Sequence, residues 1–193
     1  MQKTPNEDLP RLNVEEFRKS EKTPVVIVMD NVRSLNNIGS VFRTADAFLL
    51  QGICLCGISP TPPHRDIEKT ALGATESVEW EYFDNTTDAI EKLRENGYRI
   101  VAVEQTDKSI MLHEYQPQKN GKTALIFGHE IMGISEEVLA VCDESIEIPQ
   151  FGTKHSLNIA ISTGVVLWDF VYKLRLKYLL NQENKSAFPG MVG

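Results

Sequence analysis

Short, mainly apolar runs recur along the chain and predict the strands of a buried sheet. They cover residues 25–29, 53–58, 98–103, 124–127 and 145–148. Runs of this length, bounded by turn residues, are typical of strands covered on both faces. Val78, Trp80 and Tyr82 alternate with charged residues, which predicts a half-buried or edge strand.

Segments with helical spacing separate these runs. The segment from Ile38 to Phe48 repeats apolar residues at helix spacing, and Asn37 is its expected N-cap. Shorter helices are expected near residues 14–18, 67–71, 86–96 and 136–141. Strands that alternate with helices predict an α/β fold with a mainly parallel sheet and helices on both faces.

The longest periodic segment covers residues 156–180. It carries one apolar stripe, which consists of Leu157, Ala160, Ile161, Gly164, Val165 and Trp168. Gly164 indicates close packing of this stripe against another element, either in the core or on a partner helix.

The order of these elements divides the chain into three parts. We expect an N-terminal extension over residues 1–23, one domain over residues 24–180, and a flexible tail over residues 181–193.

The composition restricts the class of protein. A chain of 193 residues suits one well-packed domain, and no apolar run is long enough to span a bilayer. The net charge of −7 argues against broad nucleic-acid affinity but leaves room for a local basic patch. The three cysteines, Cys54, Cys56 and Cys142, lack zinc-site spacing, so we expect no metal site and a reduced cytoplasmic setting.

Two glycine-bearing loops follow predicted strands and indicate a small-molecule pocket. The run 124–127 ends at Gly128, with Glu130 and Gly133 just beyond. The run 145–148 leads through residues 149–155 into Ser156, Leu157 and Asn158, which open the long helix. Ligands in open α/β sheets bind beyond the carboxyl ends of the strands, where both loops are expected.

A third group of residues suits an anion. Gly39 lies one turn before Arg43 and is expected to leave the helix start bare, where N–H groups favour phosphate. Arg43 is then either a cation beside that spot or a solvated surface residue. His64, Arg65 and Lys69 form a basic cluster that either contacts phosphates or is simply solvated.

Three motifs in this order resemble the SpoU (TrmH-like) family of RNA ribose 2′-O-methyltransferases, within the SPOUT superfamily. The first motif is Asn37-x-Gly39-x-x-x-Arg43, and the second runs from Phe127 to Ser135. The third combines Ile148-Pro149 with Ser156-Leu157-Asn158. The match covers about residues 25–171. His129 stands where the family usually has Asn, and His155 where it commonly has Glu, which bears on specificity more than on reaction type.

The resemblance implies a C-terminal trefoil knot over roughly residues 123–168 and a homodimer with the active site at the subunit interface. It also implies S-adenosylmethionine as methyl donor, with S-adenosylhomocysteine as product, and an RNA substrate. Because the chain is compact and no appended domain is expected, we expect tRNA rather than rRNA as that substrate. The implied cofactor-binding residues are Phe127, Gly128, His129, Gly133, Ile148, Pro149, Ser156 and Leu157. The implied catalytic residues are Arg43, Asn37, Glu130, Ser156 and Asn158. The candidate RNA contacts are Arg43, His64, Arg65, Lys69 and Lys154.

Methylation of a ribose hydroxyl requires an aligned methyl donor, an aligned hydroxyl and removal of its proton. Arg43 is expected to clamp the adjacent phosphate, since a guanidinium with a pKa above about 12 is a poor base. Two alternatives remain: a non-catalytic RNA-binding protein that retains the fold, and a dinucleotide-binding oxidoreductase. The oxidoreductase is disfavoured, because no Gly-x-Gly-x-x-Gly signature of a dinucleotide-binding enzyme follows the first predicted strand.

Overall fold

The apolar run around residues 25–29 becomes a strand at the centre of one parallel sheet. This computed structural model describes residues 3–5, 8–154 and 156–176. Within them, seven strands pair in the order β3-β2-β1-β6-β4-β7-β5, and every neighbouring pair is parallel. The strands are β1 (Thr23–Asp30), β2 (Leu50–Cys56), β3 (Trp80–Phe83), β4 (Tyr98–Val103), β5 (Ile110–Met111), β6 (Lys122–Phe127) and β7 (Glu144–Glu147).

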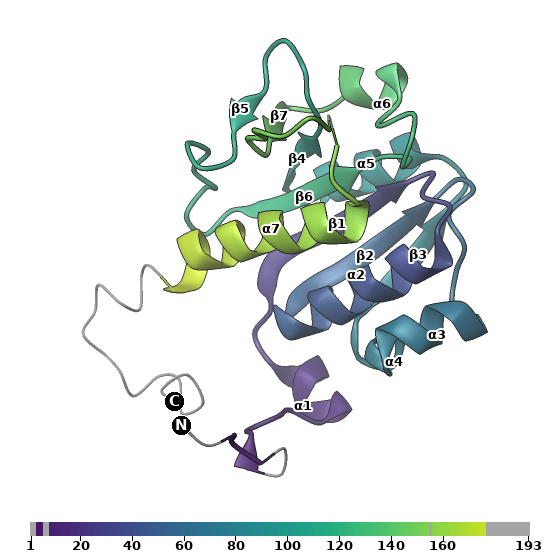
Figure 1. Cartoon of the computed structure of the whole chain (residues 1–193), viewed down its shortest axis with the longest axis vertical. Helices are drawn as coiled ribbons and strands as arrows, with labels where there is room; N and C mark the ends of the chain where they lie inside the picture. Colours follow the sequence, from purple (N-terminus) through teal and green to yellow (C-terminus); the bar gives the residue numbers. More distant parts are fainter. Residues whose placement is uncertain (1–2, 6–7, 155, 177–193) are drawn as a thin grey trace.

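Helices cover both faces of the sheet, as the alternating pattern predicts (Figure 1). They are α1 (Val14–Lys19), α2 (Leu35–Ala47), α3 (Arg65–Ala71), α4 (Ala74–Ser77), α5 (Thr86–Glu95), α6 (Glu136–Ala140) and α7 (Ile159–Val171), and a π-helical turn, η2 (Tyr172–Leu176), continues α7. Residues of α2 and α7 pack on one face, and residues of α5 and α6 pack on the other. None of the described helices is long and apolar enough to cross a membrane.

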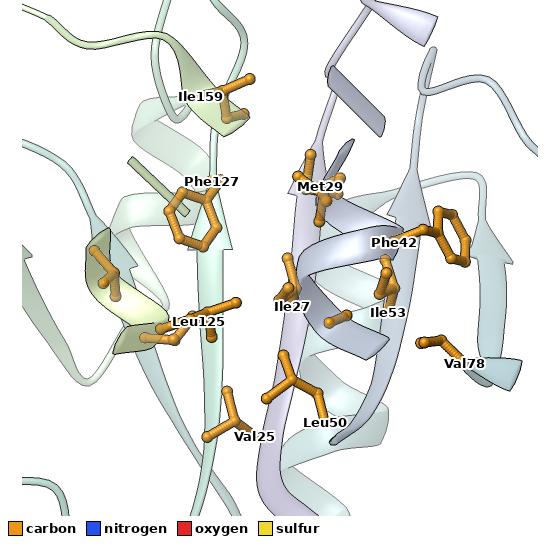
Figure 2. Packing of buried hydrophobic residues seen from close by; sticks show 14 of the residues in the cluster. Val25, Ile27, Met29, Phe42, Leu50, Ile53, Val78, Leu125, Phe127 and Ile159 are labelled. Atoms are coloured by element: carbon orange, nitrogen blue, oxygen red, sulfur yellow. The ribbon is translucent and has the colours of Figure 1, made fainter. Parts of the chain in front are cut away.

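Successive residues of β1 serve two different cores. Val25, Ile27 and Met29 belong to one cluster of buried residues with side chains of α2 and α7, and Figure 2 shows Met29 opposite Phe127. Val26 and Val28 pack on the α5 side. Each position from Val25 to Met29 therefore requires an apolar side chain, because neither face of β1 meets solvent there.

The structure corrects the predicted start of α2. The N-cap is Ser34 rather than Asn37, and its hydroxyl accepts the N–H of Asn37 at 3.3 Å. Both residue types suit an N-cap, so the local sequence does not separate them. Because Ser34 caps the helix, the side chain of Asn37 is available for another partner.

The expectation of a bare helix start at Gly39 is wrong. Gly39 is buried, and a Cβ there would overlap Thr70 Oγ1 and the carbonyl oxygen of Ile67 on α3. The glycine thus permits close packing of α2 on α3. The hydroxyl of Thr70 also donates to the carbonyl of Asn36 at 3.1 Å.

The apolar stripe predicted for the last helix is not the buried face. The buried residues of α7 are Ile159, Thr163, Val166, Leu167, Phe170 and Val171. Within the stripe, Ile161 is 57% and Trp168 55% exposed, and no atom lies within 4 Å of a Cβ built on Gly164. α7 is apolar on two sides, and of the two alternatives left open for the stripe, the core is excluded and a partner helix remains.

Other boundaries differ more modestly. The last helix begins at Ile159 rather than Ser156, and Asn158 is its N-cap. The short elements α4 and β5 were not expected. Val78 caps α4 instead of joining β3, which is an edge strand as predicted. The predicted tail over residues 181–193 lies outside the described residues, and the trefoil knot stays a prediction.

Lys173 ties the end of α7 to the segment after β5. Its Nζ donates to the carbonyls of Leu112 and Tyr115, each at 2.7 Å, and lies 2.5 Å from Asp169 Oδ2. We expect Lys173→Met to lower the unfolding free energy by about 2–4 kcal/mol, because it leaves a largely buried carboxylate and two carbonyls unpaired. Urea unfolding measures this loss.

The control is Lys19→Met, which removes the same i,i+4 pairing from an exposed site. Lys19 and Glu15 are 3.7 Å apart, with side chains 80% and 84% exposed. Its loss should change stability by less than about 0.5 kcal/mol. Equal losses in the two variants would contradict the role assigned to Lys173.

Candidate active site

A cavity of about 370 Å³ opens at the carboxyl ends of β4, β6 and β7, beside the start of α7. It is lined by Val103, Glu104, Gln105, Phe127, Gly128, His129, Glu130, Ile131, Gly133, Ile146, Glu147, Ile148, Gln150, Ser156, Leu157, Asn158, Ile159 and Ser162. Its walls thus combine aliphatic and aromatic side chains with carboxylates. Such a cavity lies in the size range of small-molecule sites.

Three motif residues from distant parts of the chain are joined by hydrogen bonds at the edge of this cavity. The amide Nδ2 of Asn37 donates to Glu130 Oε1 at 3.2 Å. The amide Nδ2 of Asn158 donates to Asn37 Oδ1, also at 3.2 Å. The predicted grouping of these residues is therefore seen in the structure, and Asn37 links the other two.

Glu130 also holds the backbone that leads into α2. Its carboxylate accepts the N–H of Arg33 at 3.2 Å and that of Ser34 at 3.0 Å. Partial burial acts to raise the pKa of Glu130, but its own N–H, those of Arg33 and Ser34, and the Asn37 amide outweigh it. The pKa therefore lies below its ordinary value, and Glu130 is ionised at neutral pH.

Two glycines shape the turn between β6 and α6. A Cβ on Gly128 would overlap the backbone of Gly133 and Ile134, so this close approach requires glycine. Gly133 has φ +67°, and a Cβ there would overlap the carboxylate of Glu104. The backbones of His129 and Gly133 bond to each other, which closes the turn.

Seven of the eight residues predicted to bind a cofactor line this cavity. The exception is Pro149, which lies between two lining residues, Ile148 and Gln150. Ser156 lines the cavity but does not cap α7. That cap is Asn158, whose Oδ1 accepts the N–H groups of Ala160 at 2.9 Å and Ile161 at 3.4 Å.

The predicted RNA-contacting residues lie outside the cavity. Arg43 is exposed on α2, and no described residue bonds to its guanidinium. Arg65 and Lys69 are exposed on α3, and Lys154 is exposed in the loop after β7. His64 has a structural role as well, because it is the N-cap of α3 and its Nδ1 accepts the N–H of Asp66 at 3.2 Å.

Sequence reasoning missed Glu104. This residue directly follows β4, lines the cavity, and accepts the N–H of Ile134 at 3.0 Å. It thus joins the end of β4 to the turn after β6. The available signal was its position as the first charged residue after a buried strand, the same signal that singled out Glu130 after β6.

A parallel sheet covered on both faces, with a cavity at the carboxyl ends of its strands, defines an α/β protein of the ligand-binding class. The SpoU rRNA methylase family model matches residues 24–168. The chain belongs to this family. The resemblance seen in the three motifs is thereby confirmed over most of the chain.

Curated relatives of the chain include enzymes named for two kinds of RNA. The tRNA (guanosine(18)-2′-O)-methyltransferase of Borreliella burgdorferi is 28% identical over 93% of this chain and 82% of the relative. The 23S rRNA (guanosine-2′-O-)-methyltransferase RlmB of Yersinia pestis is 31% identical over 88% of this chain and 66% of the relative.

Solved structures with the same fold include a TrmH/SpoU tRNA modifying enzyme from A. aeolicus. It has a TM-score of 0.74 at 25% identity, over 87% of this chain and 83% of that one. The AdoMet-bound rRNA methyltransferase of Sinorhizobium meliloti has a TM-score of 0.72 at 28% identity, over 80% of this chain and 59% of that one. These likenesses agree with the predicted α/β architecture.

Gly128→Ala tests the close approach of the two halves of the turn. The new methyl group overlaps the Gly133 and Ile134 backbone, so we expect at least about a tenfold loss of S-adenosylhomocysteine affinity in calorimetric titration. The control is Gly152→Ala, in the loop after β7, where no atom lies within 4 Å of the added Cβ. Its affinity should match that of the wild type; equal effects would contradict the steric argument.

Glu130→Gln tests the charge at the start of α2. A carboxyl group whose folded pKa is depressed stabilises the protein above its unfolded pKa, and this contribution disappears as pH falls through the folded pKa. The wild type should therefore be more stable than Glu130→Gln at pH 7, and the difference should shrink as pH falls below the ordinary Glu pKa of about 4.3 and disappear below the lower folded pKa. Urea unfolding across pH measures it, and a pH-independent difference would contradict the assignment.

Proposed function

We propose that this chain transfers a methyl group from S-adenosylmethionine to a ribose 2′-hydroxyl of RNA. The observation that carries the proposal is the hydrogen-bonded group of Asn37, Glu130 and Asn158 beside the cavity. One residue from each family motif takes part in it. Relatives of the chain are named as guanosine 2′-O-methyltransferases, which supports the same reaction.

The cavity suits S-adenosylmethionine in size and chemistry. Phe127, Ile148 and Leu157 offer apolar surface of the kind that an adenine ring packs on, and three carboxylates, Glu104, Glu130 and Glu147, line the same space. Negative charge favours a ligand with a sulfonium and an ammonium group. When bound, this cofactor supplies an electrophilic methyl group.

The roles proposed for the chain's own residues are to bind, to orient and to hold charge. Arg43 has a free planar guanidinium, which suits bidentate binding of the phosphate beside the target ribose. Glu130 stays ionised and fixes the start of α2, so it keeps Arg43 in a constant position relative to the cavity. Ser156 lines the cavity, and its hydroxyl is proposed to orient the reacting ribose.

We propose tRNA as the more fitting substrate. The chain spans 82% of the Borreliella burgdorferi enzyme that is named for tRNA, and 66% of the Yersinia pestis enzyme that is named for rRNA. The deciding experiment compares ribose methylation in total tRNA and rRNA, with and without the gene. Binding of RNA without S-adenosylmethionine binding or methyl transfer would favour the alternative, a non-catalytic RNA-binding protein.

The exposed face of α7 supports the proposal of a homodimer. Leu157, Ile161, Val165, Trp168 and Tyr172 are 40–57% exposed on this helix and its two ends. Gly164 lies among them with open space beside it, which leaves room for a second helix.

A cytoplasmic setting is also proposed, since Cys54, Cys56 and Cys142 are free thiols and none of the described helices could span a membrane.

Arg43→Ala should abolish methyl transfer and leave S-adenosylhomocysteine affinity within about threefold, because Arg43 does not line the cavity. Arg43→Lys should also be poor, because a point charge does not reproduce the planar fork. Single-turnover methylation of tRNA and calorimetric titration give the two readouts. Lys108→Ala, at another exposed cation, is the control; normal turnover of Arg43→Ala would remove Arg43 from the catalytic residues.

Trp168→Glu should convert the dimer into a monomer, because it places a charge in the centre of the exposed α7 face. Light scattering at micromolar concentration measures the change. Trp80→Glu, on the edge strand β3 where the side chain is 36% exposed, is the matched control and should stay dimeric. A wild-type monomer, or a dimeric Trp168→Glu variant, would contradict this interface.

A further inference from the structure

His129 closes the turn that carries Glu130. The backbone N–H of His129 donates to the Gly133 carbonyl at 3.0 Å, and that of Gly133 donates to the His129 carbonyl at 2.8 Å. The imidazole adds a second closure, because Nδ1 accepts the N–H of Ile131 at 3.1 Å and that of Met132 at 3.4 Å. This nitrogen therefore faces the turn's own backbone.

In proteins generally, asparagine side chains often make this hydrogen bond to the backbone two residues on. An acceptor on residue i that binds the N–H of residue i+2 mimics a backbone turn, and Asn is the usual residue for it. Here His129 makes this bond to Ile131. The chain does the same at α3, where His64 Nδ1 accepts the N–H of Asp66. An imidazole nitrogen is thus a working backbone acceptor in this protein.

Polar bonds are the main support of the tip of this turn. Ile131 is 85% and Met132 79% exposed, so apolar packing contributes little there. Glu130 lies between His129 and Ile131 and reaches across to Arg33, Ser34 and Asn37. The direction of its carboxylate therefore depends on how the turn is held.

Protonation removes this support. An imidazole accepts a hydrogen bond only through an unprotonated nitrogen, and both nitrogens become donors in the cation. The titratable groups that line the cavity with His129 are Glu104, Glu130 and Glu147, and no described lysine or arginine lines it. Histidine changes charge between about pH 5 and 8, which includes physiological conditions.

We propose that His129 is a positioning residue: its neutral imidazole holds the turn over residues 129–133, and with it Glu130 and the cavity, while its protonation releases the turn. The inference deepens the proposed function and rests on it for the identity of the ligand. On this proposal, the histidine that stands where the family usually has Asn makes ligand binding at this site depend on pH.

The test follows two signals in the whole protein from about pH 8 to about pH 5.5. One is the NMR signals of the Ile131 and Met132 amides; the other is calorimetric affinity for S-adenosylhomocysteine. In the wild type, both should change together as His129 titrates, with about a tenfold loss of affinity. His129→Asn should keep the turn and the affinity at every pH, because an amide oxygen accepts regardless of pH.

His129→Ala should bind about tenfold more weakly than the wild type at pH 8 and lose its dependence on pH. The matched control is His113→Asn. The His113 side chain is 65% exposed and lies near Glu114, so the wild-type profile should persist. The inference is overturned if His129→Asn keeps the wild-type pH profile, or if His129→Ala binds as well as the wild type.

Failure of the proposed function gives a different result. If no variant binds S-adenosylhomocysteine at any pH, the proposed cofactor is wrong, and the amide signals still decide the role of His129. The inference is also overturned, independently of any ligand, if the NMR signals of the Ile131 and Met132 amides change neither with pH nor in His129→Ala.

Discussion

The carboxylate of Glu130 connects the turn after β6 to the backbone that enters α2, and the arrangement of the site depends on this contact. The carboxylate accepts the backbone N–H groups of Arg33 and Ser34, which precede Glu130 by 97 and 96 residues in the chain. A negative charge at the start of a helix is favoured by the helix dipole as well as by these bonds. The backbone that leads into α2, and with it Asn37, is thus held by a single side chain from another segment.

Residues of this site combine local structure with site geometry. Asn158 caps α7 through its oxygen and donates to Asn37 through its nitrogen. An amide side chain is required for both bonds, since a carboxylate has no hydrogen to donate. Helix capping and site geometry are therefore two results of one orientation of Asn158. Because Ser34 is the N-cap of α2, the side chain of Asn37 is available to bond to Glu130 and Asn158.

The predictability of each element depends on how local its cause is. The strand β1 follows from the continuous apolar run over residues 25–29, and β4 follows from a mainly apolar run and has the predicted bounds. The two-residue strand β5 exists only because β7 lies beside it, which no local pattern reveals. The choice of Ser34 over Asn37 as N-cap agrees with the bond from Asn37 to Glu130, 93 residues away. The pattern of α7 did not decide between core and partner helix for its stripe, because two faces of the helix are apolar.

Gly39 sets a length as well as permitting a contact. With no side chain at this position, the backbones of α2 and α3 meet directly, and the bond from Thr70 to Asn36 fixes their register. Cations on the two helices, Arg43 on one and Lys69 on the other, are therefore held at a constant spacing. A larger residue at position 39 would push α2 and α3 apart, and would so alter the spacing of the two cations without touching either of them.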